Sequence, residues 1–183
     1  MKKYGVLFIA LTVAAFIASF SLISAQAQDM TLWVGKWFKL TNSNTENCLN
    51  DAQKIIRDSY TFTSYLKIWS WDSENSILYA DDYSYDNDGQ RWNIVSFQFN
   101  YLGGTDLDFL FSSQGTIDDP EEYASYALVG RITGKTKAGN LKSAAFNAPG
   151  INSVGTHCTN WGKNVGSMIP ESKVQVPSEV IIH

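Results

Sequence analysis

The sequence offers few side chains for acid–base or nucleophilic chemistry near neutral pH. Histidine is the residue type that titrates in that range, and the chain has only two, His157 and His183. It contains no Gly-x-Ser-x-Gly motif, no phosphate-binding glycine loop and no His-Glu-x-x-His zinc motif. A carboxylate pair for glycoside cleavage is defined in space, and the sequence singles none out. We therefore predict no catalytic residue, no cofactor and a protein that is not an enzyme.

One acidic segment carries part of a calcium-binding pattern. Asp86-Asn87-Asp88-Gly89 has oxygen ligands at alternating positions but lacks the bidentate Glu that a calcium loop supplies further on. The same residues are typical of a hairpin turn, because glycine adopts a positive φ without strain. His157 beside Cys158 also falls short of the four ligands of a structural zinc site. We predict a turn at 86–89 and no metal site.

Aromatic residues are the main candidates for binding. In the segment 60–71, strand alternation puts Tyr65, Trp69 and Trp71 on one face and an adequate core face on the other. The two tryptophans then need cover from a ligand, a partner or a loop, and an exposed flat row would suit sugar stacking. The predicted ligand-binding set is Trp37, Tyr65, Trp69, Trp71 and Trp92.

The chain has two cysteines, Cys48 and Cys158. An isolated pair is expected to be bridged in an oxidising compartment. Closing so long a loop stabilises a fold by about 4 kcal/mol in the chain-entropy model. We predict a structural disulfide, with two free thiols as the alternative.

The first 27 residues have the three parts of a secretory signal peptide. Lys2 and Lys3 form the positive start, residues 6–23 are almost entirely apolar, and Ala25-Gln26-Ala27 is a small-x-small cleavage site. The apolar run approaches the length of a membrane span, so an uncleaved anchor is the alternative. We predict cleavage, a single domain over 28–183, no membrane span after cleavage and a secreted or periplasmic location.

Charge argues against nucleic acid as a partner. The chain has 14 basic and 18 acidic residues, and loss of Lys2 and Lys3 with the signal leaves 12 against 18, a net charge of −6. Such a surface repels phosphate backbones and anionic lipid. The remaining partner classes are a small apolar molecule or a glycan.

The elements that must position these residues are short strands. Apolar and polar residues alternate in segments separated by turn residues, which is typical of antiparallel sheets. The predicted strands are 32–40, 60–71, 77–85, 92–101, 107–111, 123–135, 141–146 and, more weakly, 153–161. We also predict a short helix over 49–58, a bulge or sharp bend near Val95 and an irregular tail from about 162. Eight strands with mostly short connections favour an all-β, antiparallel up-and-down barrel, with a β-sandwich as the alternative.

Gly35-Lys36-Trp37 resembles the Gly-x-Trp motif on the first strand of lipocalins and the wider calycin group, which are small secreted β-barrels. The resemblance covers about ten residues and the strand count. It implies that Gly35 lets the chain enter the barrel floor and that Trp37 faces inward and closes the lumen. It also implies a basic residue over the Trp37 ring, by topology Lys163 or, as a second candidate, Arg131. Lipocalins have an arginine there, and a lysine cannot stack as a planar guanidinium does.

The sequence thus predicts an exported lipocalin-like protein that binds a small apolar or aromatic ligand in its barrel lumen. The alternative is an exported carbohydrate- or surface-binding module that uses exposed aromatic residues. A third hypothesis is an enzyme of a type that these motifs do not reveal. An interior Trp37 below a void would favour the first, and a planar aromatic platform would favour the second.

Processing is directly testable. Because the small-x-small site ends at Ala27, the exported protein should begin at Gln28. Intact-mass measurement should give that chain, with or without cyclisation of Gln28. Recovery of a chain that retains residues 1–27 from a membrane fraction would contradict the prediction.

Overall fold

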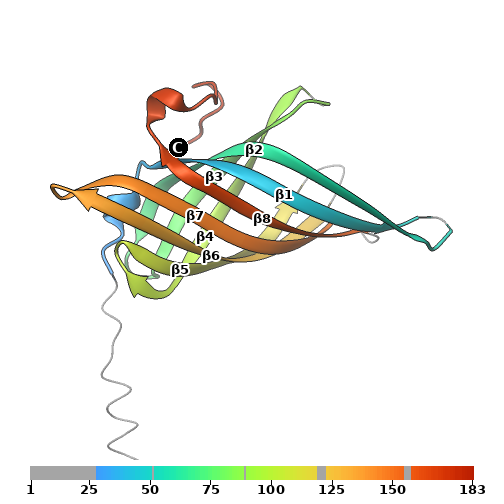
Figure 1. Ribbon diagram of the computed structural model, residues 1–183, viewed down its shortest axis with the longest axis horizontal. Helices are drawn as coiled ribbons and strands as arrows, with labels where there is room; N and C mark the ends of the chain where they lie inside the picture. Colours follow the sequence, from blue (N-terminus) through green and yellow to red (C-terminus); the bar gives the residue numbers. More distant parts are fainter. Residues whose placement is uncertain (1–27, 51, 89, 119–122, 155–157) are drawn as a thin grey trace, which may run out of the picture.

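A computed structural model describes residues 28–183 except 51, 89, 119–122 and 155–157. Eight antiparallel strands close into a barrel in chain order (Figure 1), which confirms the predicted up-and-down barrel. The strands are β1 (Trp37–Leu49), β2 (Ile55–Asp72), β3 (Ile77–Asp86), β4 (Arg91–Thr105), β5 (Asp108–Asp118), β6 (Tyr123–Lys137), β7 (Asn140–Val154) and β8 (Cys158–Ile169). A short 3-10 helix, η1 (Thr31–Trp33), precedes β1, and a second, η2 (Glu171–Lys173), follows β8. Within the described residues, no helix has the length and apolar character needed to cross a membrane.

The seam that closes the barrel is the pairing of β1 with β8. Cys48 lies directly opposite Cys158 in this pairing, with Cα atoms 4.1 Å apart, and the two form a disulfide. The predicted disulfide is therefore confirmed. A bond between the first and last strands indicates an oxidising compartment.

The predicted helix over 49–58 is wrong. β1 continues to Leu49, β2 begins at Ile55, and these two residues pair across the hairpin. The side chain of Asn50 accepts hydrogen bonds from the backbone N–H groups of Ala52 and Lys54 at 3.0 and 2.9 Å. Such side-chain bonds to the local backbone favour a turn over a helix.

Several predicted strand limits also change. The segment 32–40 is not one strand, because its first residues form η1 and the strand starts at Trp37. The segment 153–161 spans the end of β7 and the start of β8, and part of it lies outside the described residues. β8 continues to Ile169, so the tail begins at 170 and not at 162.

The predicted bulge near Val95 is wrong as well. β3 and β4 pair without a register shift through that position. Trp92 and Ile94 lie on the outer face of β4 and pack against the tail, so both faces of this strand are apolar without a bulge. The register of β2 shifts instead between Ile68 and Ser70.

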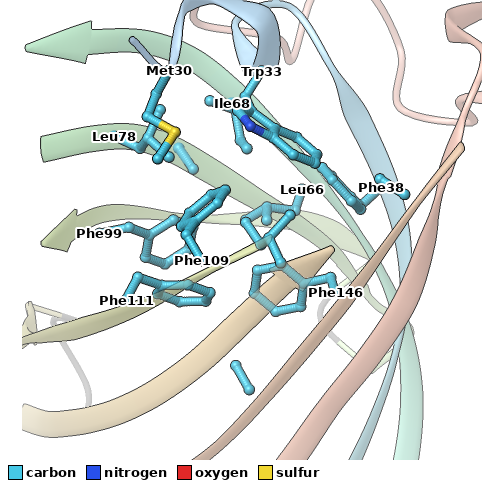
Figure 2. Close-up of a cluster of buried hydrophobic side chains, with 14 of the residues drawn as sticks. Met30, Trp33, Phe38, Leu66, Ile68, Leu78, Phe99, Phe109, Phe111 and Phe146 are labelled. Atoms are coloured by element: carbon cyan, nitrogen blue, oxygen red, sulfur yellow. The ribbon is translucent and has the colours of Figure 1, made fainter. Parts of the chain in front are cut away.

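An aromatic core fills one end of the barrel, and η1 closes that end. Trp33 is fully buried, stacks on Phe38, meets Phe109 edge-on and donates its Nε1–H to the Asp106 carbonyl at 2.7 Å. A Cβ at Gly134 would approach the Trp33 ring to 2.8 Å, so a glycine makes room for the indole. Figure 2 shows the rings below Trp33 at this closed end, which belong to Phe99, Phe109, Phe111 and Phe146.

Trp37 does not close the lumen, which corrects the implication of the lipocalin resemblance. Gly35 turns the chain between η1 and β1 with a φ of +79°, and the alternation of β1 then sends Phe38 and Leu40 inward. Trp37 points outward and is nevertheless only 1% exposed. Trp33 occupies the position at the barrel floor that the resemblance assigned to Trp37.

The predicted cation over Trp37 is also a different residue. Lys67, on the neighbouring strand β2, places its Nζ 5.2 Å from the Trp37 ring centre. Arg131 instead pairs with Asp108 through two bonds of 2.7 and 2.6 Å. Lys163 lies opposite Ser43, whereas Trp37 pairs with Ile169 at the other end of β8.

The tail (residues 170–183) covers the outer face around Trp37, and Figure 1 shows it against the outside of the barrel. Val176 packs with the buried rings of Trp37, Tyr65 and Tyr83. The Tyr65 hydroxyl donates to Gln175 Oε1 at 2.6 Å. The tail therefore completes a second, smaller core outside the barrel.

The closed end should tolerate truncation far less than the outer wall. Trp33→Ala should lower the free energy of unfolding by about 3–5 kcal/mol, because it removes a fully buried ring and leaves a cavity. Trp161→Ala is the matched control, since this ring is 54% exposed and its loss should change stability by less than about 0.5 kcal/mol. Chemical denaturation measures both, and equal losses would contradict η1 as the closure.

Candidate functional site

The barrel interior changes character halfway along its axis. Beyond the aromatic core, polar side chains join the apolar and aromatic ones that face inward, and together they surround a cavity of about 180 Å³. Five asparagines line it together with one carboxyl group. The polar lining residues are Asn42, Asn44, Asn152, Asn160, Asn164, Asp82 and Ser84.

Strand alternation explains why the asparagines meet. On β1 the inward series Phe38, Leu40 continues as Asn42 and Asn44. The pairing registers then place Asn42 opposite Asn164 and Asn152 opposite Asn160. The sheet thus brings together amides that lie far apart in the chain.

Two glycines keep this half of the barrel from filling. A Cβ on Gly162 would collide with the Asn44 side chain, and a Cβ on Gly150 would approach the Leu128 Cβ to 2.9 Å. Gly150 and Gly162 lie opposite each other on β7 and β8. Their missing side chains make room for the side chains of Asn44 and Leu128.

The cavity opens at the end of the barrel away from η1. Phe62 faces inward and lines the cavity, yet it is 38% exposed. Tyr60, the next inward residue toward the mouth, is 41% exposed. A small molecule therefore has an entrance lined by two aromatic rings, stacked at a centroid distance of 6.3 Å.

The polar groups of the wall are only partly satisfied. Asn42 donates from Nδ2 to the Ser64 hydroxyl at 2.8 Å, and Asn160 donates from Nδ2 to the Tyr60 hydroxyl at 2.8 Å. Asn160 is only 4% exposed, and its Oδ1 atom is buried without a hydrogen-bond partner. A buried polar atom without a hydrogen bond is costly, so a donor group that reached this oxygen would stabilise the protein.

Asp82 is the one charged residue among the described residues that line the cavity. It lies between Leu66 on β2 and Val95 on β4, which are both apolar. Burial raises the pKa of Asp82 from its ordinary 3.8 to about 7, and a hydrogen bond from Ser64 opposes this rise. Its Oδ1 atom is buried and has no partner.

The mouth adds further negative charge. Burial raises the pKa of Tyr60, and the nearby carboxylates of Glu46 and Asp58 raise it further. Asp86 lies across from Arg91, with 3.9 Å between Oδ2 and Nε. Glu46 and Asp58 therefore favour a cation near Tyr60, whereas the pair of Asp86 and Arg91 adds no net charge.

None of the five predicted ligand-binding residues lines this cavity. Trp37, Tyr65 and Trp92 belong to the outer cluster beneath the tail, and Trp69 stacks on His183 at a centroid distance of 4.0 Å. Trp71 follows the register shift in β2, so it turns inward and packs against the aromatic core. The predicted row of Tyr65, Trp69 and Trp71 is therefore not one face, and no exposed platform forms from it.

The cavity-lining residues that the sequence analysis missed are the lumen asparagines and Asp82. Their signal is present in the sequence, because Asn42 and Asn44 keep the spacing of Phe38 and Leu40. Asn160 and Asn164 have the same parity on their strand. Polar residues that continue an inward apolar series indicate the hollow part of a barrel.

Metal binding finds little support in the described part of the chain. The one group of close potential ligands there is Glu46, Cys48 and Cys158, and its two sulfur atoms are bonded to each other. The turn at 86–88 uses the Asp86 carboxylate to accept a hydrogen bond from the Asp88 backbone N–H at 2.9 Å, as a hairpin turn does.

The chain matches no protein-family model, no curated protein and no solved structure.

The raised pKa of Asp82 has a measurable effect on stability. Between about pH 4 and pH 7 the folded protein keeps a proton that the unfolded chain releases, so stability falls as pH rises through that window. Asp82→Asn removes this effect and should stabilise the protein by about 1–3 kcal/mol at pH 8, with almost no gain at pH 4. Denaturant titrations at both pH values are the measurement.

The matched control is Asp88→Asn in the exposed turn, which should change stability by less than about 0.5 kcal/mol at either pH. A loss of stability in Asp82→Asn at pH 8 would show that the carboxylate is satisfied in the native state.

Proposed function

We propose that this chain is an exported binding protein that takes one small molecule into the open half of its barrel. The observation that carries the proposal is the cavity of about 180 Å³ with unpaired buried oxygens on Asp82 and Asn160. A few convergent polar groups on an otherwise aromatic wall are typical of ligand sites. Export rests on the signal-peptide pattern at 1–27 and agrees with the disulfide.

Cavity size limits the ligand. An engineered apolar cavity of about 150 Å³ holds benzene, so a site of about 180 Å³ suits one ring with a short substituent. The aromatic side chains that meet such a ring are Phe62, Phe97 and Tyr126. The ligand is therefore partly aromatic, as the sequence analysis expected, but it also carries a polar group for the amide-lined wall.

The lipocalin resemblance supports this function in outline only. A closed eight-stranded barrel with a short 3-10 helix at one end suits a lumen-binding protein. Gly35-Lys36-Trp37 does not contribute to the lumen, since Trp37 packs outside. We propose that this protein is similar to lipocalins in its barrel architecture and in binding its ligand inside the lumen.

A glycan-binding surface has less support. Such a surface needs exposed rings in a row, and Trp37 and Tyr65 are 1% and 4% exposed beneath the tail. Trp69 is occupied by the stacked His183 ring. The lumen is the better site.

Lumen binding is testable by introducing a large side chain that fills the cavity. Ligand-observed NMR with a set of single-ring aromatic compounds identifies binders to the wild-type protein. Asn164→Phe places a ring into the cavity and should weaken binding of each compound at least tenfold.

Lys163→Phe is the matched control, because this adjacent residue is exposed on the outer face of β8 and should leave binding unchanged. Absence of any binder, or equal loss of binding in both variants, would contradict the proposal. Native mass spectrometry of the purified protein gives an independent reading, since a retained ligand adds a discrete mass.

A further inference from the structure

The unpaired groups of the cavity wall specify the chemistry of the ligand. Asp82 Oδ1 and Asn160 Oδ1 are both oxygen atoms, so each calls for a hydrogen-bond donor. The described lining residues include no Lys, Arg or His that could neutralise Asp82 from within. Its neighbours across the sheet, Leu66 and Val95, are apolar. The wall lacks a cation at this point.

One aromatic group of the cavity lining lies one inward position deeper on β4. Phe97 is the next inward residue after Val95 on β4, and successive inward positions are about 6.5 Å apart along a strand. Its ring meets Tyr126 edge-on, with centroids 5.1 Å apart. A ligand that contacts both Asp82 and these rings needs a hydrogen-bond donor group that is separated from the ligand's aromatic ring by a chain of about two bonds.

We propose that the lumen binds a compact arylalkyl amine, with its ammonium group on Asp82 and its ring against Phe97 and Tyr126. This inference rests on the proposed function and narrows it to one ligand class. The ammonium provides the donors that Asp82 lacks and removes the charge imbalance of the site. The acidic mouth, with Glu46 and Asp58 near Tyr60, attracts the same charge.

The proposal gives a pH dependence of defined sign. Asp82 binds the amine as a carboxylate, and its pKa in the free protein is about 7. Affinity for the amine should therefore fall about tenfold from pH 8 to pH 6, where most of the free protein is protonated at Asp82. Tyr126 is the other ionisable side chain among the described lining residues, and Glu46, Asp58, Tyr60, Asp86 and Arg91 lie nearer the mouth.

The test compares two probes of equal shape, 2-phenylethylamine and 2-phenylethanol, by isothermal titration calorimetry. At pH 8 the amine should bind at least tenfold more tightly than the alcohol. At pH 7, amine binding should release about half a proton, measured as the dependence of the heat on buffer ionisation enthalpy. The alcohol should release none.

Two variants assign the effect to Asp82. Asp82→Asn should bind both probes with equal affinity and release no proton, and thermal unfolding verifies that it is folded. Asp88→Asn, which removes an exposed carboxylate from the β3–β4 turn, should keep the preference for the amine.

Equal affinity of the wild-type protein for the two probes, unchanged in Asp82→Asn, would overturn the amine proposal and leave lumen binding intact. Failure of both probes to bind would also overturn it. If the wider set of single-ring compounds fails as well, the proposed function falls with it, so the two failures are distinguishable.

Discussion

Closure of the sheet is the constraint on which the rest of this structure depends. β1 pairs along its length with both β2 and β8, which closes the sheet in chain order, so the side chains of these strands face either the lumen or the outside. The disulfide bond between Cys48 and Cys158 fixes the seam near the open end. Closure also sets the interior width, and side chains then decide how much of that space stays empty. Trp33 and the phenylalanines fill one end, whereas asparagines and glycines line the other.

Two adjacent aspartates show that the lumen is chemically different from other buried places in this chain. Asp81 is fully buried on the outer side, where it accepts from Ser96 at 2.8 Å and contacts His183 Nδ1 at 2.8 Å. Asp82, one residue on, faces the lumen with an unpaired oxygen. The fold surrounds Asp81 with partners and leaves one carboxyl oxygen of Asp82 without any. Buried polar groups without hydrogen bonds destabilise a protein. Where they persist, they are often part of a binding site.

Much of the fold follows from the sequence, and the failures have identifiable physical causes. Alternation and turn residues predicted the barrel, and the isolated cysteine pair predicted the disulfide that the structure places at its seam. The helix expected over 49–58 failed because tertiary pairing of β1 with β2 overrides weak helical spacing, helped by the side chain of Asn50. The inward assignment of Trp37 failed because both faces of β1 are apolar near its start, and periodicity alone cannot say which face is inside. The tail settles that choice, since it covers Trp37 from more than a hundred residues away in the chain.

The candidate site was harder to predict than the fold for a related reason. Large aromatic residues attract attention in a sequence, yet in this chain the tryptophans serve packing: Trp33 in the floor, Trp37 beneath the tail and Trp71 in the core. The site consists of small polar residues whose importance depends on position, because an asparagine on an outer strand face is unremarkable and an inward asparagine in a closed barrel is costly. Their relevance emerges only when the register aligns Asn42 with Asn164 and Asn152 with Asn160. Since the pairing of Asn42 with Asn164 joins the first and last strands, the hollow half of the barrel is a property of closure. Local sequence patterns show only which residues of a strand share a face.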